Sequence, residues 1–183
     1  VYKITLNGGM TCPNRDGKVG HGGCIFCSAA GSGDFAGSAT CSITEQLVMG
    51  KENLIKKRPV HSYIAYFQAF TNTYASVEYL RRIYMEAIQD PDVQILSIAT
   101  RPDCLPEDIL QLLEEINQIK PVWVELGLQT IHPQTATYIR RGYPLEVFEE
   151  AVNNLRRRNI SVITHTILGL PGENEDMMLE TID

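Results

Sequence analysis

VQILSIATRPDCLPEDILQLLEEINQIKPVWVELGLQT, residues 93 to 130, predicts a strand, a helix and a second strand. The runs at 93–99 and 122–128 are short and rich in β-branched apolar residues, as buried strands are. Between them, Pro106 suits the first turn of a helix over 106–119, and apolar residues recur there at helical spacing. Two apolar strands joined by a helix indicate a parallel sheet that is covered by helices.

The same alternation extends in both directions along the chain. The predicted strands are residues 2–6, 62–67, 93–99, 122–128 and 161–168. The predicted helices are residues 43–57, 76–89, 106–119 and 144–158, with a further helix that begins at 175. Ser42 or Thr44, just before Glu45, is the expected N-cap of the first helix.

Five strand–helix units predict an α/β fold, a partial and open βα barrel of the TIM type with parallel strands and with the helices outside. A doubly wound open sheet is the second choice. A closed eight-unit barrel usually needs about 250 residues, and 183 residues are too few for one. We expect residues 1–183 to form a single core domain that is truncated at both ends. In either architecture the functional residues lie at the carboxyl ends of the strands.

Composition restricts the class of protein. A net charge of −6 argues against a broad phosphate-binding surface, and no apolar run has the roughly 20 residues of a membrane span. The five cysteines are an odd set without a visible secretory signal, which indicates metal or redox chemistry and a cytoplasmic location.

Three of these cysteines lie in CPNRDGKVGHGGCIFC, residues 12–27, within a glycine-rich loop over residues 8–41. Cys24 and Cys27 form a C-x-x-C pair, and Cys12 lies eleven intervening residues upstream. A zinc knuckle would need a fourth ligand, for which the candidates are Cys41, Cys104 and His21. An iron–sulfur cluster held by three cysteines would keep one iron open. Unligated cysteines are the third alternative.

With these motifs in view, the chain resembles the radical S-adenosylmethionine (radical SAM) superfamily. The resemblance rests on the three-cysteine loop with Phe26 before its last cysteine, on TRPD after the third strand, on ELGLQT and on GLPGE. CPNRDG and the long first gap resemble a bacterial subgroup related to the elongator catalytic subunit and to oxygen-independent coproporphyrinogen oxidase. Most superfamily members carry three residues between the first two cysteines, so this gap departs from the common pattern.

The resemblance implies two cofactors, a [4Fe-4S] cluster and S-adenosylmethionine (SAM). Cys12, Cys24 and Cys27 would bind the cluster, and SAM would chelate the fourth iron. The implied activity is that of an oxidoreductase-like iron–sulfur enzyme. It would cleave SAM reductively to a 5′-deoxyadenosyl radical, which abstracts hydrogen from an unknown substrate.

The same resemblance implies SAM-binding roles for residues at the strand ends. Gln68 and Ala69 occupy the place of the Gly-Gly-Glu-like segment that binds the methionine amino group. Glu125 and Gln129 suit the ribose hydroxyls, and Arg140 or Arg141 suits the methionine carboxylate. The other implied SAM-binding residues are Phe26, Ser97, Thr100, Arg101, Ile167, Gly169 and Leu170.

Two functions of other classes remain open at this point. One is a zinc-stabilised binding module without catalysis, and the other is an iron–sulfur electron carrier with Cys41 or Cys104 as fourth ligand. The expected partners are SAM, an electron donor and an unknown substrate. RNA is one candidate for that substrate, and no membrane partner is expected. His165 is either a core histidine or a substrate contact.

Overall fold

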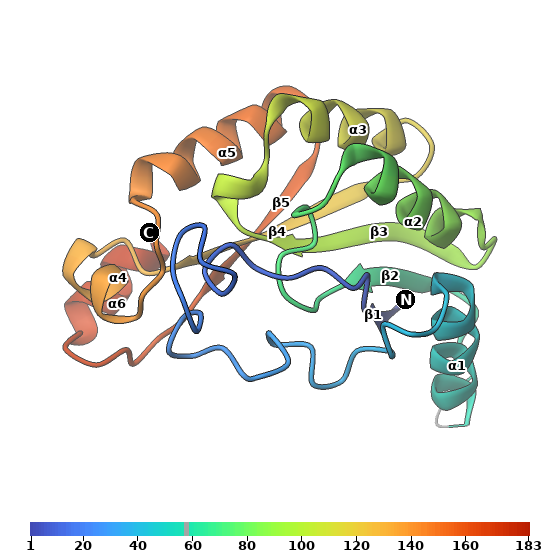
Figure 1. The fold of residues 1–183 in the computed structure, drawn as a ribbon, viewed down its shortest axis with the longest axis horizontal. Coiled ribbons are helices and arrows are strands. Elements are labelled where there is room, and N and C mark those ends of the chain that lie inside the picture. Colours follow the sequence, from blue (N-terminus) through green and yellow to red (C-terminus); the bar gives the residue numbers. More distant parts are fainter. Residues whose placement is uncertain (57–58) are drawn as a thin grey trace.

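The computed structural model describes residues 1–56 and 59–183. Five parallel strands form one sheet in the order β1-β2-β3-β4-β5 (Figure 1). The strands are β1 Tyr2–Leu6, β2 Tyr63–Phe67, β3 Val93–Thr100, β4 Val122–Gln129 and β5 Ser161–Thr166. Right-handed connections between strands in this unreversed order place the connecting helices on one face. The sheet is open, so the predicted partial barrel is confirmed and the doubly wound alternative is wrong.

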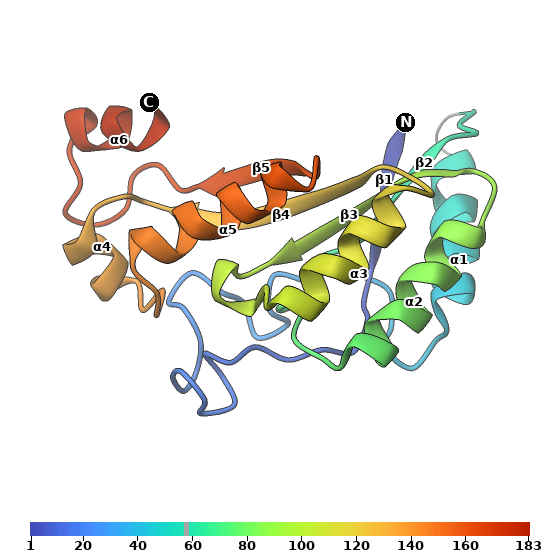
Figure 2. The ribbon, with the colours of Figure 1, turned by 90° about the horizontal axis from the view of Figure 1, so that it is seen from above.

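Four helices cover one face of the sheet, namely α1 Ile43–Ile55, α2 Val77–Gln89, α3 Glu107–Asn117 and α5 Leu145–Arg157. Two further helices, α4 Pro133–Tyr138 and α6 Glu175–Ile182, lie beyond the carboxyl ends of β4 and β5 (Figure 2). No helix within the described residues has the length and apolarity that crossing a membrane requires.

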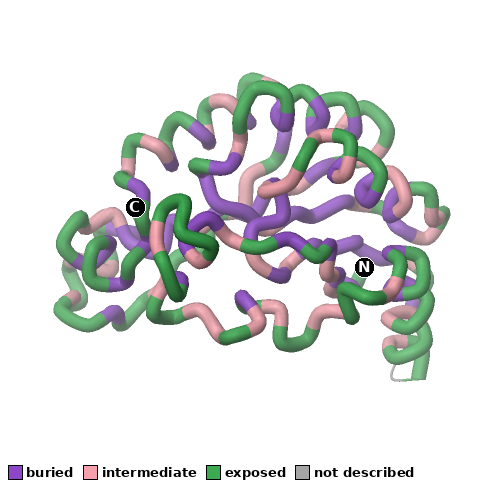
Figure 3. The backbone as a smooth tube through the Cα atoms, in the orientation of Figure 1, coloured by how far each residue is buried: buried purple, intermediate pink, exposed green. Residues whose placement is uncertain are grey.

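The core lies between the sheet and the four covering helices (Figure 3). Side chains alternate along a strand, so every second residue of β4 points to the helices, and Val124 and Leu126 are fully buried there. The Phe67 ring meets Tyr84 of α2 edge-on, with 5.2 Å between ring centroids. The other face of the sheet carries polar side chains such as Lys3, Ser97 and Glu125. The cysteine loop runs below the sheet in Figure 1.

Local chemistry fixes where the cysteine loop ends. Ser42 is the N-cap of α1 and forms a capping box with Glu45, whose carboxylate accepts from the Ser42 amide at 2.7 Å. This reciprocal pairing satisfies two amides that the first helical turn leaves free. The helix therefore begins at Ile43, directly after its N-cap Ser42 and two residues after Cys41. The predicted end of this helix, at residue 57, lies outside the described residues.

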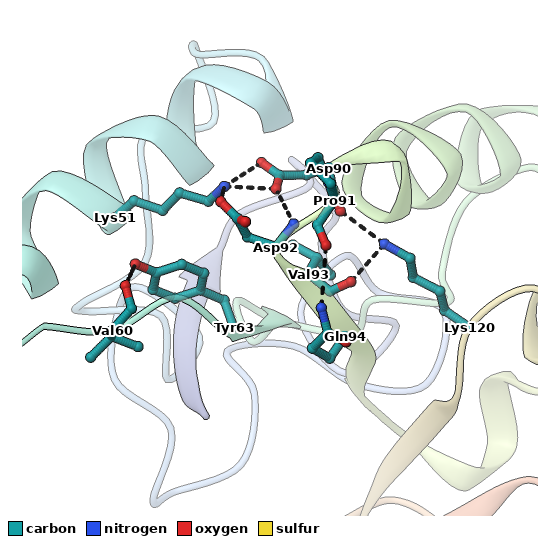
Figure 4. Close-up of polar contacts among 9 residues, drawn as sticks. All are labelled: Lys51, Val60, Tyr63, Asp90, Pro91, Asp92, Val93, Gln94 and Lys120. Atoms are coloured by element: carbon teal, nitrogen blue, oxygen red, sulfur yellow. Dashed lines mark hydrogen bonds and ion pairs between the residues drawn. The ribbon is translucent and has the colours of Figure 1, made fainter.

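A cluster of ion pairs closes the opposite end of the sheet (Figure 4). Lys51 of α1 reaches Asp90 at 2.6 Å and Asp92 at 2.8 Å, both in the turn before β3. Lys120 donates to the backbone oxygens of Asp90 and Val93 at 2.8 and 2.6 Å. In barrels of this type the amino ends of the strands serve stability. These contacts tie α1, α2 and α3 to that end.

The structure differs from the predicted elements at the carboxyl ends. The fifth strand ends at Thr166 rather than at 168, because the chain turns at Gly169, whose φ is +80°. Helix α4 and a short 3₁₀ turn, η1 Pro102–Cys104, were not predicted. Both are too short to show an apolar periodicity, so the sequence holds little signal for them.

Candidate active site

A cavity of about 270 Å³ opens at the carboxyl ends of the strands. Cys12, Cys24 and Cys27 border it, together with residues that follow or end β2, β3, β4 and β5. The predicted site residues on its wall are Cys12, Cys24, Phe26, Cys27, Gln68, Thr100, Arg101, Glu125, Gln129 and Ile167. Residues that the sequence places more than 150 positions apart therefore share one site.

The long segment between Cys12 and Cys24 folds back on itself. The carbonyl of Pro13 accepts from Val19 and Gly20 at 2.8 and 3.3 Å, and the Asn14 carbonyl accepts from Gly23 at 2.8 Å. The Cys27 amide donates to Cys24 at 3.1 Å and closes the C-x-x-C turn. These backbone hydrogen bonds fold the segment back toward Cys12. Cys12 and Cys24 therefore border the same cavity although eleven residues separate them.

The loop docks on the segment after β2. The Phe70 amide donates to the Gly31 carbonyl at 2.9 Å, and the Thr71 amide donates to the Thr11 carbonyl at 3.2 Å. A Cβ at Gly31, where φ is +60°, would collide with the Phe70 ring. Glycine at this position therefore allows the contact that places the cysteines over the sheet.

The candidates for a fourth protein ligand lie elsewhere. Cys41, Cys104 and His21 are absent from the cavity wall, and all five cysteines are free. Burial, followed by the charge of Asp103, raises the pKa of Cys104 to about 12. Within residues 1–56 and 59–183, no group of three or more His, Cys, Asp or Glu side chains is arranged to hold a single metal ion.

Arg101 is fixed at the cavity wall by three partners. Its guanidinium pairs in a bidentate manner with Asp103 at 2.9 and 2.7 Å and donates to the Arg141 carbonyl at 2.9 Å. It also stacks on the Tyr143 ring, with 4.8 Å between its carbon and the ring centroid. Burial opposes its charge, but Asp103 outweighs burial and raises the pKa of Arg101. The side chain is therefore a fixed cation beside the cysteines.

Glu125 is the centre of a polar network deeper in the cavity. Its buried carboxylate accepts from Lys3 of β1 at 2.5 Å, from His165 of β5 at 2.8 Å and from Ser97 of β3. Burial alone would raise its pKa, but the bonds from His165, Lys3 and Ser97 prevail and lower the pKa to about 2. This carboxylate thus joins three strands across the polar face of the sheet.

The network predicts a pH-dependent loss of stability when Glu125 is replaced. The pKa of about 2 in the folded protein lies below the ordinary 4.5. The carboxylate therefore stabilises the fold above pH 4.5, and this stabilisation is lost as the pH falls toward 2. We expect Glu125→Gln to lower the free energy of unfolding by about 1–3 kcal/mol at pH 7. The difference from the parent should shrink below pH 4.5.

Urea unfolding, followed by the fluorescence of Trp123, the single tryptophan, measures this difference. Glu115→Gln is the matched control, because Glu115 pairs with Arg81 on the exposed surface and should matter little at any pH. Equal stability of parent and Glu125→Gln at pH 7 would contradict the network.

Gln129 has an unusual backbone at the end of β4. Its φ is +60°, and its side chain folds back over Gly127, where a Cβ would overlap the amide. The Tyr143 hydroxyl donates to the Gly127 carbonyl at 2.5 Å and lies 3.3 Å from the Gln129 amide oxygen. Tyr143 therefore holds the Gln129 amide at the cavity wall.

Six of the predicted SAM-binding residues do not border the cavity: Ala69, Ser97, Arg140, Arg141, Gly169 and Leu170. Ala69 and Leu170 are buried in packing, and Ser97 faces Glu125. Arg140 and Gly169 are exposed. Arg141 is only 2% exposed and donates to the carbonyls of Leu128, Thr130 and Tyr143.

Other cavity residues were not predicted as parts of the site. Arg15 donates to the carbonyls of Ser28 and Ala29 and packs on the Phe70 ring at 5.3 Å. Tyr66 borders the cavity beneath Lys3, whose ammonium lies 4.0 Å from the Tyr66 ring centroid. The alternation of side chains along β2 is the one sequence signal that could have indicated Tyr66.

Comparison with known proteins agrees with this arrangement. The model of the radical SAM superfamily matches residues 12–183, from the first loop cysteine to the end of the chain. The chain belongs to the radical SAM superfamily. Membership supports a radical SAM enzyme that uses SAM and an iron–sulfur cluster.

Two curated relatives match along the whole chain. The uncharacterised protein YtqA of Bacillus subtilis is 52% identical over 181 residues, which are 99% of this chain and 56% of that protein. YhcC of Escherichia coli K12 is 43% identical over 184 residues, which are 100% of this chain and 58% of that protein. The chain thus spans little more than half the length of these two relatives.

Solved structures share the fold at low identity. Elp3 of Methanocaldococcus infernus has a TM-score of 0.67 at 17% identity, over 98% of this chain and 41% of its own. Coproporphyrinogen III oxidase (HemN) of E. coli has a TM-score of 0.63 at 15% identity, over 99% and 40%. Both support the open barrel fold.

Proposed function

We propose that this chain is the catalytic core of a radical SAM enzyme with a [4Fe-4S] cluster on Cys12, Cys24 and Cys27. One observation carries the proposal. The three cysteines border a single cavity, whose remaining wall is built from the carboxyl ends of the strands. This is the edge of a βα barrel at which substrates and cofactors bind.

The donor set fits such a cluster. Three thiols face one cavity, and the other two cysteines are outside its wall, so one iron would keep a position for a small-molecule ligand. When bound and reduced, the cluster would supply one electron to the SAM sulfonium, whose C–S bond breaks to give methionine and a 5′-deoxyadenosyl radical for hydrogen abstraction from a substrate.

The chain's own side chains would bind and orient SAM. Gln68 and Gln129 offer amide groups at the carboxyl ends of β2 and β4, and Arg101 offers a fixed positive charge beside the cysteines. Either Arg101 or Arg15, which border the cavity, suits the methionine carboxylate better than Arg141, which does not border it. Ile167 contributes apolar surface for the adenine, which helps to exclude water.

The experiment is anaerobic purification of the full-length protein, followed by analysis of iron, acid-labile sulfide and zinc. Dithionite and SAM are then added, and 5′-deoxyadenosine is measured by mass spectrometry. About four irons and four sulfides per chain with 5′-deoxyadenosine formation are expected. One tightly held zinc without iron would favour the binding module instead. A cluster that cleaves no SAM would favour the electron carrier.

Identification of the substrate and the partners requires the whole protein. The two proteins of similar fold point to no common substrate, since one is Elp3 and the other is a coproporphyrinogen III oxidase. We therefore propose hydrogen abstraction as the reaction class and leave RNA among the substrates to be tested. An electron donor, implied by the resemblance, and a cytoplasmic location, expected from the odd number of cysteines, remain predictions.

A further inference from the structure

Asn14, the second residue after Cys12, contacts a cysteine of the proposed cluster through its side chain. The side chain is buried, and the residue is 4% exposed. Its amide nitrogen lies 3.3 Å from Cys24 Sγ and 2.6 Å from the backbone oxygen of Arg140. Asn14 thus joins one cysteine to the chain segment between α4 and α5.

The two partners fix the direction of the amide. A carbonyl oxygen only accepts hydrogen bonds, and so does a metal-bound thiolate. Both hydrogens of the Asn14 amide are therefore used, one by each partner. The other end of the amide, Oδ1, lies where a Cβ at Gly20 would overlap it and 3.6 Å from a Cβ at Gly142. Packing on that side holds the amide in place.

We propose that Asn14 is a positioning residue that sets the reduction potential of the cluster through its hydrogen bond to Cys24. This rests on the proposed function, because it assumes a cluster on Cys24. Reduction adds negative charge to the cluster and its sulfurs. An N–H donor stabilises that charge, so it favours the reduced form and raises the potential. The bond to Arg140 keeps the donor aimed at sulfur.

The test compares the reduction potential of the full-length protein with that of two variants of similar shape. Asn14→Leu removes both N–H donors, and Asn14→Asp replaces the donor by a carboxylate. Potentials are measured by EPR-monitored titration without added SAM. At the wild-type midpoint, the ratio of reduced to oxidised cluster should fall about tenfold in Asn14→Leu, a shift of about 59 mV for one electron. Asn14→Asp should shift further in the same direction.

Asn117→Leu is the matched control. Asn117 on α3 also makes two structural hydrogen bonds, to the Asn159 carbonyl at 3.2 Å and from the Val122 amide at 2.9 Å, but it is remote from the cavity wall. Its replacement should leave the potential unchanged. An unchanged potential in Asn14→Leu that carries a cluster would overturn the proposal.

A second readout needs no variant to fold. Pulsed EPR of the reduced wild-type cluster, in protein labelled with [¹⁵N]asparagine, should show a weak nitrogen coupling from the N–H···S bond. Absence of this coupling would overturn the proposal, even if Asn14→Leu fails to load a cluster. A wild-type protein without iron and sulfide would overturn the proposed function instead, so the two failures are distinguishable.

Discussion

Replacing Cys24 by alanine should abolish cluster loading and reduce formation of 5′-deoxyadenosine by more than about 100-fold. Even residues that only support metal ligands are worth roughly 10–100-fold in metal affinity or activity, and Cys24 is a proposed ligand. Two cysteines on the cavity would remain, and no other cysteine borders it. Iron and sulfide analysis of anaerobically purified protein, with product measured by mass spectrometry, checks this.

Cys104→Ala is the matched control for Cys24→Ala. Cys104 is buried, follows Asp103 in η1 and is outside the cavity wall. We expect this variant to keep its iron, its sulfide and most of its activity. If Cys104→Ala loses the cluster as Cys24→Ala does, the cluster has four protein ligands. The hypothesis that one iron stays open for SAM, on which the proposed function depends, would then be wrong.

Replacing Arg141 by methionine should lower the free energy of unfolding by about 3–5 kcal/mol. The Arg141 guanidinium donates to Leu128 and Thr130 at 2.6 Å and to Tyr143 at 3.0 Å, and all of these acceptors are backbone oxygens. Methionine fills similar space but leaves these carbonyls without their donor. Domains of this size are stable by only about 5–15 kcal/mol, so the loss should be plain in urea unfolding.

Arg140→Met is the matched control, because Arg140 is the neighbouring arginine and its side chain is exposed. This variant should unfold within about 0.5 kcal/mol of the parent, as surface substitutions usually do. If Arg141 instead binds the methionine carboxylate, Arg141→Met should keep its stability and raise the KM for SAM. That result would contradict the structural role.

The fold followed from the sequence because its signals are local and repeated. Apolar β-branched runs such as 93–99 and 122–128 alternate with amphipathic segments, and parallel strands joined by helices allow few arrangements. The capping pair of Ser42 and Glu45 marked the start of α1 in the same way. Helix α4 has six residues and no such periodicity, so propensity could not identify it.

The cysteines and the strand-end residues also followed from the sequence, because a parallel sheet brings the carboxyl ends of its strands to one edge. Gln68, Thr100 and Gln129 reach the cavity for this reason. Their proximity to Cys12 was predictable, although their individual roles remain predictions.

The sequence by itself determined the class of fold, the trio of cysteines and the edge of the sheet at which they lie. Only the tertiary structure decided which side chains face the cavity. Arg140 has a φ of +56°, and this turn leaves its side chain outside while Arg141 enters the interior. The sequence does not distinguish these two adjacent arginines, because the direction of a side chain after a short helix depends on backbone angles that distant contacts select.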